Sequence, residues 1–231
     1  MSERKHSLAV EDLARHFEGG VITALDGVSF EAAAGEVLAL MGPSGCGKST
    51  LLSLIGLLDR PTRGRVMIDG TDLAGVEKPG AFRARTIGFV FQAHHLLPAM
   101  TLLENVSAPL IALGVPRTQR TARAMTLLEW VGLKSRAHFL PSKLSGGERQ
   151  RGAVGRALAT HPQIILADEP TGNLDTKNGE AVVQLLVDHA RVHGALVIIA
   201  THNPEISAVA DRTLVMRDGK ITAIQRREQF I

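Results

Sequence analysis

Two stretches of this chain have the composition of a phosphate-binding loop. The first reads Gly42-Pro43-Ser44-Gly45-Cys46-Gly47-Lys48-Ser49 and lies between an apolar run typical of a strand and a segment with helical spacing. Glycines at these positions let backbone N–H groups surround phosphate oxygens, and Lys48 adds a positive charge that reaches the β and γ phosphates. The hydroxyl of Ser49 can contact Mg²⁺. This stretch predicts a site for a nucleoside triphosphate.

The second stretch reads Leu144-Ser145-Gly146-Gly147-Glu148-Arg149-Gln150-Arg151. Ser145 and Glu148 have the spacing of a capping box, which starts a helix. Gly146 and Gly147 leave that start without side chains, so its backbone N–H groups can face an anion. Because one nucleotide needs one cradle, a second anion site suggests that it serves a nucleotide held by another copy of the chain.

Two adjacent carboxylates follow the apolar run Ile164–Ala167. Asp168 is placed to hold Mg²⁺, directly or through water, and Glu169 to polarise an attacking water as a general base. The alternative is that the two acids merely cap the end of a strand. The phosphate loop elsewhere in the chain favours the catalytic interpretation.

Two further polar residues stand directly after apolar runs. Gln92 follows Ile87–Phe91, where its amide can contact Mg²⁺ or water, and His202 follows Leu196–Thr201, where its ring can contact a phosphate. A lone glutamine is by default a turn residue, and one histidine among nine is weak by itself. Their positions relative to the other motifs favour a functional role for both.

Short runs rich in Val, Ile and Leu predict the strands that must position these residues. The runs are Leu8–Val10, Val28–Phe30, Val37–Met41, Val66–Ile68, Ile87–Phe91, Ile164–Ala167, Leu196–Thr201, Thr213–Met216 and Ile221–Ile224. Helical segments at Lys48–Leu57, Asn178–Val192 and Glu205–Ala208 follow the central runs, which predicts βα alternation around a parallel sheet. The early strands are shorter and joined by glycines, which predicts an antiparallel flank.

From about Pro98 to Lys143 the pattern changes to helices, which we expect Pro109, Pro116 and Pro141 to break. We therefore predict a single α/β domain over residues 1–231. Its core and β flank are expected to span about 1–97 and 145–231, and an inserted α-helical subdomain about 98–144.

Composition narrows the class of protein. The 231 residues are 45% hydrophobic, and 26 basic side chains against 23 acidic ones give a net charge of +3, a near balance from which no nucleic-acid partner is inferred. The basic run Arg117, Arg120, Arg123 is a solvated helix face or, alternatively, a face near anionic lipid.

The single cysteine, Cys46, fits a reducing compartment, and we interpret it as a small filler of the loop rather than a redox group. No apolar run approaches the roughly 18 residues of a membrane span, so a membrane role would come through a partner.

Taken in order, these runs resemble the motifs of the ATP-binding cassette (ABC) ATPases. Gly42–Ser49 resembles the Walker A motif, Gln92 the Q-loop, Leu144–Glu148 the family signature, Ile164–Asp168 Walker B with Glu169 as catalytic carboxylate, Asn173-Leu174-Asp175 the D-loop and His202 the switch histidine. The family often stacks an aromatic residue on adenine. This chain has no Tyr, and Phe17 is the nearest candidate.

The resemblance implies a P-loop NTPase (RecA-like) core with the antiparallel β flank and the inserted helical subdomain, acting as an ATPase with ATP and Mg²⁺. It implies that two copies close head to tail around two ATP molecules. The implied ATP-binding residues are Phe17, Gly42, Pro43, Ser44, Gly45, Cys46, Gly47, Lys48, Ser49, Thr50, Gln92, Ser145, Gly146, Gly147, Asp175 and His202. The implied catalytic residues are Glu169, His202 and Gln92, and the implied Mg²⁺ ligands are Ser49, Gln92 and Asp168.

Three stretches look like one branch of the family, the group that contains LolD, MacB and FtsE: Phe82–Gln92, Leu103–Val106 and Thr171–Asp175. Members of that group pair with membrane subunits that carry large extracytoplasmic domains. The resemblance therefore implies a homodimeric ATPase at the cytoplasmic face of the inner membrane, driving a permease of the lipoprotein-release or export type. The alternative is an ATPase that controls a membrane-linked periplasmic process such as cell division.

Overall fold

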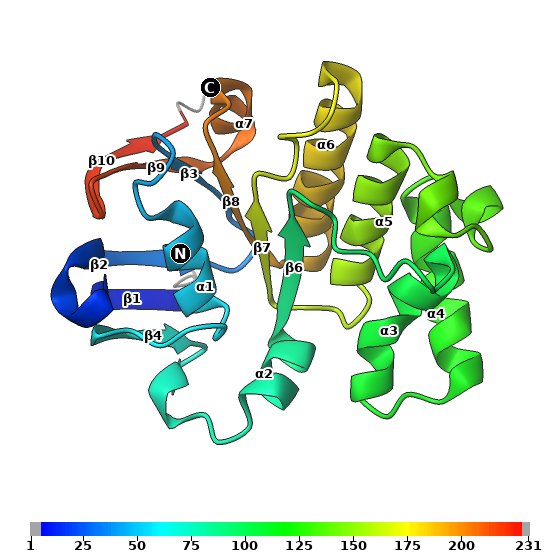
Figure 1. The fold of residues 1–231 in the computed structure, drawn as a ribbon, viewed down its shortest axis with the longest axis horizontal. Coiled ribbons are helices and arrows are strands. Elements are labelled where there is room, and N and C mark those ends of the chain that lie inside the picture. The colour runs from blue at the N-terminus through cyan, green and yellow to red at the C-terminus, as the bar shows by residue number, and fades with distance from the viewer. Residues whose placement is uncertain (1–5, 228–231) are drawn as a thin grey trace, which may run out of the picture.

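Two β-sheets and the helices around them form the structure, a computed structural model that describes residues 6–227 (Figure 1). The strands are β1 His6–Phe17, β2 Ile22–Ala33, β3 Val37–Met41, β4 Arg63–Ile68, β5 Thr71–Asp72, β6 Ile87–Phe91, β7 Ile164–Asp168, β8 Leu196–Thr201, β9 Arg212–Arg217 and β10 Lys220–Arg226. The helices are α1 Lys48–Ile55, α2 Pro79–Thr86, α3 Leu102–Ala112, α4 Arg117–Trp130, α5 Gly146–Ala157, α6 Thr176–His193 and α7 Pro204–Val209. Every predicted strand lies within an observed one.

The larger sheet has the strand order β10-β9-β3-β8-β7-β6, in which β10 pairs antiparallel with β9 and the other neighbours are parallel. Its alternating side chains build two separate cores. Leu38, Leu40 and Leu166 pack toward α1 and the smaller sheet, whereas Val37, Ile165 and Val197 pack toward α5 and α6. Burial of both faces explains why the central strands are apolar throughout, and the predicted parallel sheet is confirmed.

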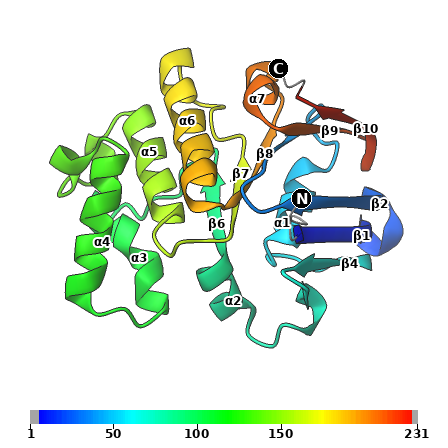
Figure 2. The same cartoon turned by 180° about the vertical axis from the view of Figure 1, so that it is seen from behind.

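The smaller sheet is the predicted antiparallel flank, with the order β2-β1-β4-β5. In Figure 2 it lies on the side of the molecule away from α3 and α4. Its inward side chains, including Leu13 and Leu25, join the core beneath α1. This sheet therefore backs the phosphate loop that precedes α1.

Residues 98–144 contain α3 and α4, which pack on α5. Our expectation that Pro109 breaks a helix is wrong, since it lies inside α3. The loss of one N–H donor is outweighed by a complete capping box at the helix start and by burial of Leu102, Val106 and Leu110. We did not predict helix α2 from the sequence, because its residues have little apolar periodicity.

None of the helices in the described part of the chain has the length and apolar character needed to cross a membrane.

Candidate functional site

The predicted site residues meet at one edge of the parallel sheet. The last residues of β3 and β8 face each other, as do the last residues of β6 and β7. The first residues beyond these four strands are Gly42, His202, Gln92 and Glu169. Because carboxyl ends of parallel strands share an edge, the phosphate loop and three polar side chains converge there.

The phosphate loop connects β3 to α1. Gly47 has a left-handed φ of 102° and stands at the helix start without a side-chain cap, so the first N–H groups of α1 stay available to an anion. Lys48 Nζ donates to the carbonyls of Gly42 at 2.7 Å and Pro43 at 3.0 Å. The ammonium group is therefore held over the loop. Cys46 is buried, as a filler would be.

Ser49 and Asp168 form the candidate Mg²⁺ site. Burial raises the pKa of Asp168 and the charge of Glu169 adds to the rise, whereas the Ser49 hydroxyl and Lys48 oppose it. Oδ1 of Asp168 is buried and has no hydrogen-bond partner among the described residues. A carboxylate oxygen with unused lone pairs beside a hydroxyl fits Mg²⁺, which takes few protein carboxylates and completes its shell with phosphate and water oxygens. The described residues hold no cluster of three or more His, Cys, Asp or Glu suited to a metal.

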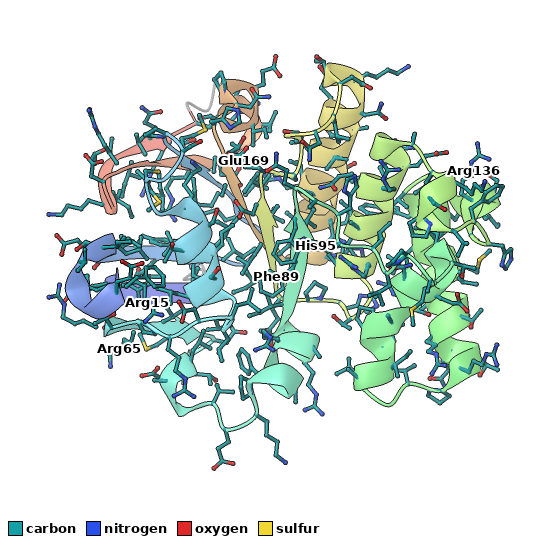
Figure 3. All side chains as sticks on the ribbon, viewed as in Figure 1. Arg15, Arg65, Phe89, His95, Arg136 and Glu169 are labelled. Carbon is teal, nitrogen blue, oxygen red and sulfur yellow. The ribbon has the colours of Figure 1, made fainter. Side chains whose placement is uncertain are left out.

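Glu169 and His202 come together although β7 and β8 carry them separately. Nδ1 of His202 lies 3.0 Å from Oε1 of Glu169, and the Thr201 hydroxyl donates to Oε2 at 3.4 Å. Glu169 has a φ of +46°, which is uncommon for a residue with a side chain and turns the chain sharply after β7. The pair lines a cleft of about 360 Å³, and Glu169 lies at the strand end in Figure 3. A carboxylate oriented by a histidine in an open cleft suits proton transfer from water.

Gln92 lies against the loop that follows Glu169. Its amide donates to Oδ1 of Asn173 at 3.4 Å, and a Cβ added to Gly172 would come within 2.7 Å of Gln92 Nε2. The structure therefore joins Gln92 to the D-loop stretch. Its role as a Mg²⁺ ligand stays a prediction.

The start of α5 has the predicted capping box. Ser145 Oγ accepts from Glu148 N–H at 3.2 Å, and the Glu148 carboxylate accepts from Ser145 N–H at 2.8 Å. Arg136 also donates to Glu148, and these bonds lower the pKa of that carboxyl, the Ser145 backbone bond most. A Cβ added to Gly146 would lie 3.9 Å from the Leu174 side chain, so the signature and the D-loop stretch are neighbours.

Asp175 caps α6 through Oδ1 and binds the Asn178 side chain through Oδ2. Oδ1 accepts from Asn178 N–H at 2.9 Å and Oδ2 from the Asn178 amide at 2.7 Å, which lowers the Asp175 pKa. Asn178 in turn accepts from Arg151 of α5 at 3.0 Å. The sequence reasoning missed Asn178 and Arg151, although the D-x-x-N spacing of a helix cap was readable.

Phe17 ends β1 and is half-buried. The guanidinium of Arg15 stands 4.5 Å from the centre of the Phe17 ring, and Arg15 is itself paired with Asp59 at 2.9 Å. One face of the ring is thus covered by a cation. Stacking of adenine on the other face stays a prediction.

Two α5 side chains absent from the sequence predictions hold the segment around Gln92. Gln150 donates to the carbonyl of Phe91 at 3.1 Å, and Arg156 donates to the carbonyls of His94 and His95. No local spacing signals these contacts, because their partners lie far away in sequence.

The sequence profile of the ABC transporter family matches residues 25–172. An uncharacterized ABC transporter ATP-binding protein of Thermotoga maritima is 50% identical and covers 89% of this chain and 88% of its own length. The lipoprotein-releasing system ATP-binding protein LolD of Bacteroides fragilis is 46% identical over 89% of this chain and 99% of its own.

Solved structures agree with the sequence relatives. The ATP-binding cassette MJ0796, as a post-hydrolysis dimer bound to ADP and Pi, has a TM-score of 0.89 and 37% identity over 96% of this chain and all of that one (100%). CbiO1 of Clostridium perfringens, part of the ABC transporter complex cbiONQ, has a TM-score of 0.87 and 28% identity over 96% of this chain and 89% of that one. The chain therefore belongs to the ABC transporter family, as one of its ATPase subunits.

Proposed function

We propose that the chain forms a homodimer around two Mg-ATP and drives a membrane permease of the lipoprotein-release or export type. The observation that carries the proposal is the open start of α5 beside the loop 173–175. This start is a second anion site. The nucleotide bound by the chain's own phosphate loop does not need it, because that loop already surrounds its phosphates. The LolD relatives support the pathway, and the solved dimer of a similar cassette supports the paired unit.

Within one subunit the loop Gly42–Ser49 and Thr50 bind the phosphates, and Phe17 contributes to the base site. Ser49, Asp168 and Gln92 would hold Mg²⁺, which would neutralise the charge that develops on the transferred phosphoryl group. Glu169 takes a proton from the attacking water. His202, 3.0 Å from it, orients that carboxylate and contacts phosphate.

Between subunits, Ser145, Gly146 and Gly147 contact the γ-phosphate of the nucleotide in the other copy. Asp175 acts at the same junction indirectly, since both of its carboxylate oxygens already accept from Asn178, which lies beside Gly147. Nucleotide then favours the closed pair, because its phosphate bridges both chains only there.

Closure of the dimer moves two parts of each chain, and this movement is passed to the membrane partner. The two parts are the helical subdomain, about 98–144, and the core, about 1–97 and 145–231. Gln150 and Arg156 bind the residues on either side of Gln92 and so connect that segment to α5, whose start faces the other nucleotide. This connection supports a permease contact near Gln92. The working location is then the cytoplasmic face of the inner membrane, with the ATPase held there by the permease.

Replacement of the general base tests the enzyme assignment. Glu169→Gln should slow ATP hydrolysis by roughly 10²- to 10⁴-fold while ATP affinity is kept, because the amide preserves the shape but accepts no proton. Steady-state phosphate release and nucleotide titration measure the two quantities. Glu205→Gln, an exposed acid at the start of α7, is the matched control and should change turnover less than about twofold.

The same variant tests the paired unit. With ATP and Mg²⁺, Glu169→Gln should elute as a dimer on size exclusion and as a monomer without nucleotide. Near-normal turnover would contradict the base assignment. A monomer at saturating ATP would contradict the proposed homodimer of the isolated subunit.

A further inference from the structure

The turn between β9 and β10 packs against the outer side of the phosphate loop. Gly219 N–H donates to the carbonyl of Cys46 at 3.1 Å, and the Gly219 carbonyl accepts from Asp26 N–H at 3.0 Å. Lys220 adds an ion pair to Asp26 at 3.0 Å. A single residue near the end of the chain therefore joins the middle of the phosphate loop to β2.

The bond from Gly219 fixes one peptide unit of the loop. A peptide is planar and trans, so the carbonyl of Cys46 and the N–H of Gly47 point in opposite directions. Holding the carbonyl on the outer side aims the Gly47 N–H at the inside of the loop. Inward N–H groups are what a phosphate cradle requires, and an outward carbonyl needs a partner of this kind.

Close packing on the outer side of the loop leaves little freedom for this peptide. A Cβ on Gly42 would meet the carbonyl oxygen of Met216 at 2.3 Å, and one on Gly47 would meet that of Ala24 at 2.4 Å. At Gly219 itself, with φ of +75°, a Cβ would lie 3.0 Å from the same Ala24 oxygen. Glycine is thus favoured at 219 by backbone conformation and by space.

The chain contains a second Asp-Gly turn that serves as an internal comparison. Asp69 and Gly70 have φ of 47° and 78°, and Asp218 and Gly219 have φ of 48° and 75°. Positive φ at both positions is the type I′ hairpin geometry. A Cβ on Gly70 would meet nothing within 4 Å, whereas Gly219 is packed and bonds to Cys46 of the phosphate loop, so the two turns share their conformation but differ in surroundings.

We propose that Gly219 is a positioning residue for nucleotide binding, which sets the direction of the Cys46–Gly47 peptide from outside the phosphate loop. The inference rests on the proposed function, since that loop must bind phosphate for its orientation to matter. Its consequence is that the β9–β10 turn controls nucleotide affinity without touching the nucleotide.

The test compares Gly219→Ala with Gly70→Ala by calorimetric titration with MgADP and by thermal unfolding. Both variants should lower the melting temperature, because both place a Cβ at positive φ. Gly219→Ala should also weaken MgADP affinity by about fivefold to tenfold and Gly70→Ala by less than about twofold. In ATP hydrolysis, Gly219→Ala should raise KM with little change in kcat.

Equal affinities in the two variants, with wild type binding MgADP, would overturn the inference and leave the proposed function standing. No binding by wild type would overturn the proposed function and the inference with it. If Gly219→Ala does not fold, Gly219→Asn is measured against the same thresholds, because Asn adopts positive φ more readily than Ala.

Discussion

Helices α3 and α5 begin with the same chemistry and end up with different surroundings. Thr101 and Glu104 form a complete capping box at α3, and Ser145 and Glu148 form one at α5. Each has a hydroxyl that accepts from the third N–H and a carboxylate that accepts from the cap residue. By capping alone the two helix starts are equivalent.

The two helix starts differ in whether the first N–H groups after the cap residue have hydrogen-bond acceptors. In α3, Leu102 N–H donates to the carbonyl of Phe139 at 2.9 Å and Leu103 N–H to that of Ala137 at 2.8 Å. In α5, the N–H groups of Gly146 and Gly147 have no acceptor among residues 6–227. The start of α3 is closed by the chain itself, and the start of α5 is open to an anion.

The residues after the cap explain the difference. Leu102 is fully buried, and its side chain draws the start of α3 into the core, where the chain must satisfy the backbone. Gly146 and Gly147, the first two residues of α5, have no side chain to bury, and Gly147 allows α5 to approach Asn178 of α6 closely. A capping box thus marks where a helix begins, and the next residues decide whether its N–H groups remain available.

The largest expected effect comes from blocking each helix start with a bulky cation. Ser145→Arg should reduce ATP turnover by more than about 100-fold, because the open N–H groups face the nucleotide of the other copy in the proposed dimer. Thr101→Arg loses an equivalent cap but should keep turnover within about threefold. Steady-state ATPase assays compare the two. Equal loss in both, or loss of ATP binding by the isolated Ser145→Arg monomer, would contradict the role across the dimer.

A smaller effect, on stability, should distinguish the first two glycines of α5, Gly146 and Gly147. A Cβ on Gly147 would stand 2.4 Å from Asn178 Oδ1, so Gly147→Ala should lower the free energy of unfolding by about 1–3 kcal/mol. The nearest atom to a Cβ on Gly146 is 3.9 Å away, so Gly146→Ala should change it by less than about 0.5 kcal/mol. Urea unfolding measures both. Asn178→Ala should reduce the cost of Gly147→Ala, and an undiminished cost in that background would refute the steric explanation.

The smallest effect is a difference in acid stability between the two caps. The pKa of Glu148 is lowered by the Ser145 backbone bond and by Arg136, and the pKa of Glu104 by its bonds to Thr101. A lowered pKa gives stability that is present above the unfolded glutamate value of about 4.3 and is lost as pH falls through the folded value. Each Glu→Gln variant should therefore lose less stability than wild type on acidification.

Urea midpoints from about pH 6 to about pH 3 test this expectation. Glu148→Gln should flatten the curve more than Glu104→Gln, because Arg136 pairs with Glu148 at 3.0 Å. Curves that run parallel to wild type would exclude ionised caps as a source of stability. A larger effect of Glu104→Gln would show that the ion pair adds nothing.

Sequence periodicity predicted the strands well because burial on both faces leaves β3, β7 and β8 apolar throughout. It failed at α2, whose helix has little apolar pattern, and at Pro109, where tertiary packing outweighs a missing N–H. Residues such as Lys48 and Glu169 were predictable because each belongs to a short motif next to a strand. Gln150 and Arg156 were not, since their contacts depend on which helix packs against which loop.

The sequence by itself determined the phosphate loop, the two acids after β7 and the capping box of Ser145 and Glu148, because each is a local pattern whose chemistry is set by neighbours along the chain. Tertiary structure alone decided that Glu169 lies 3.0 Å from His202, that α5 stays open where α3 is closed, and that Gly219 holds the phosphate loop. These contacts join segments remote in sequence. Helices and strands that pack on both faces of the larger sheet bring these remote segments together. No local sequence pattern encodes that packing.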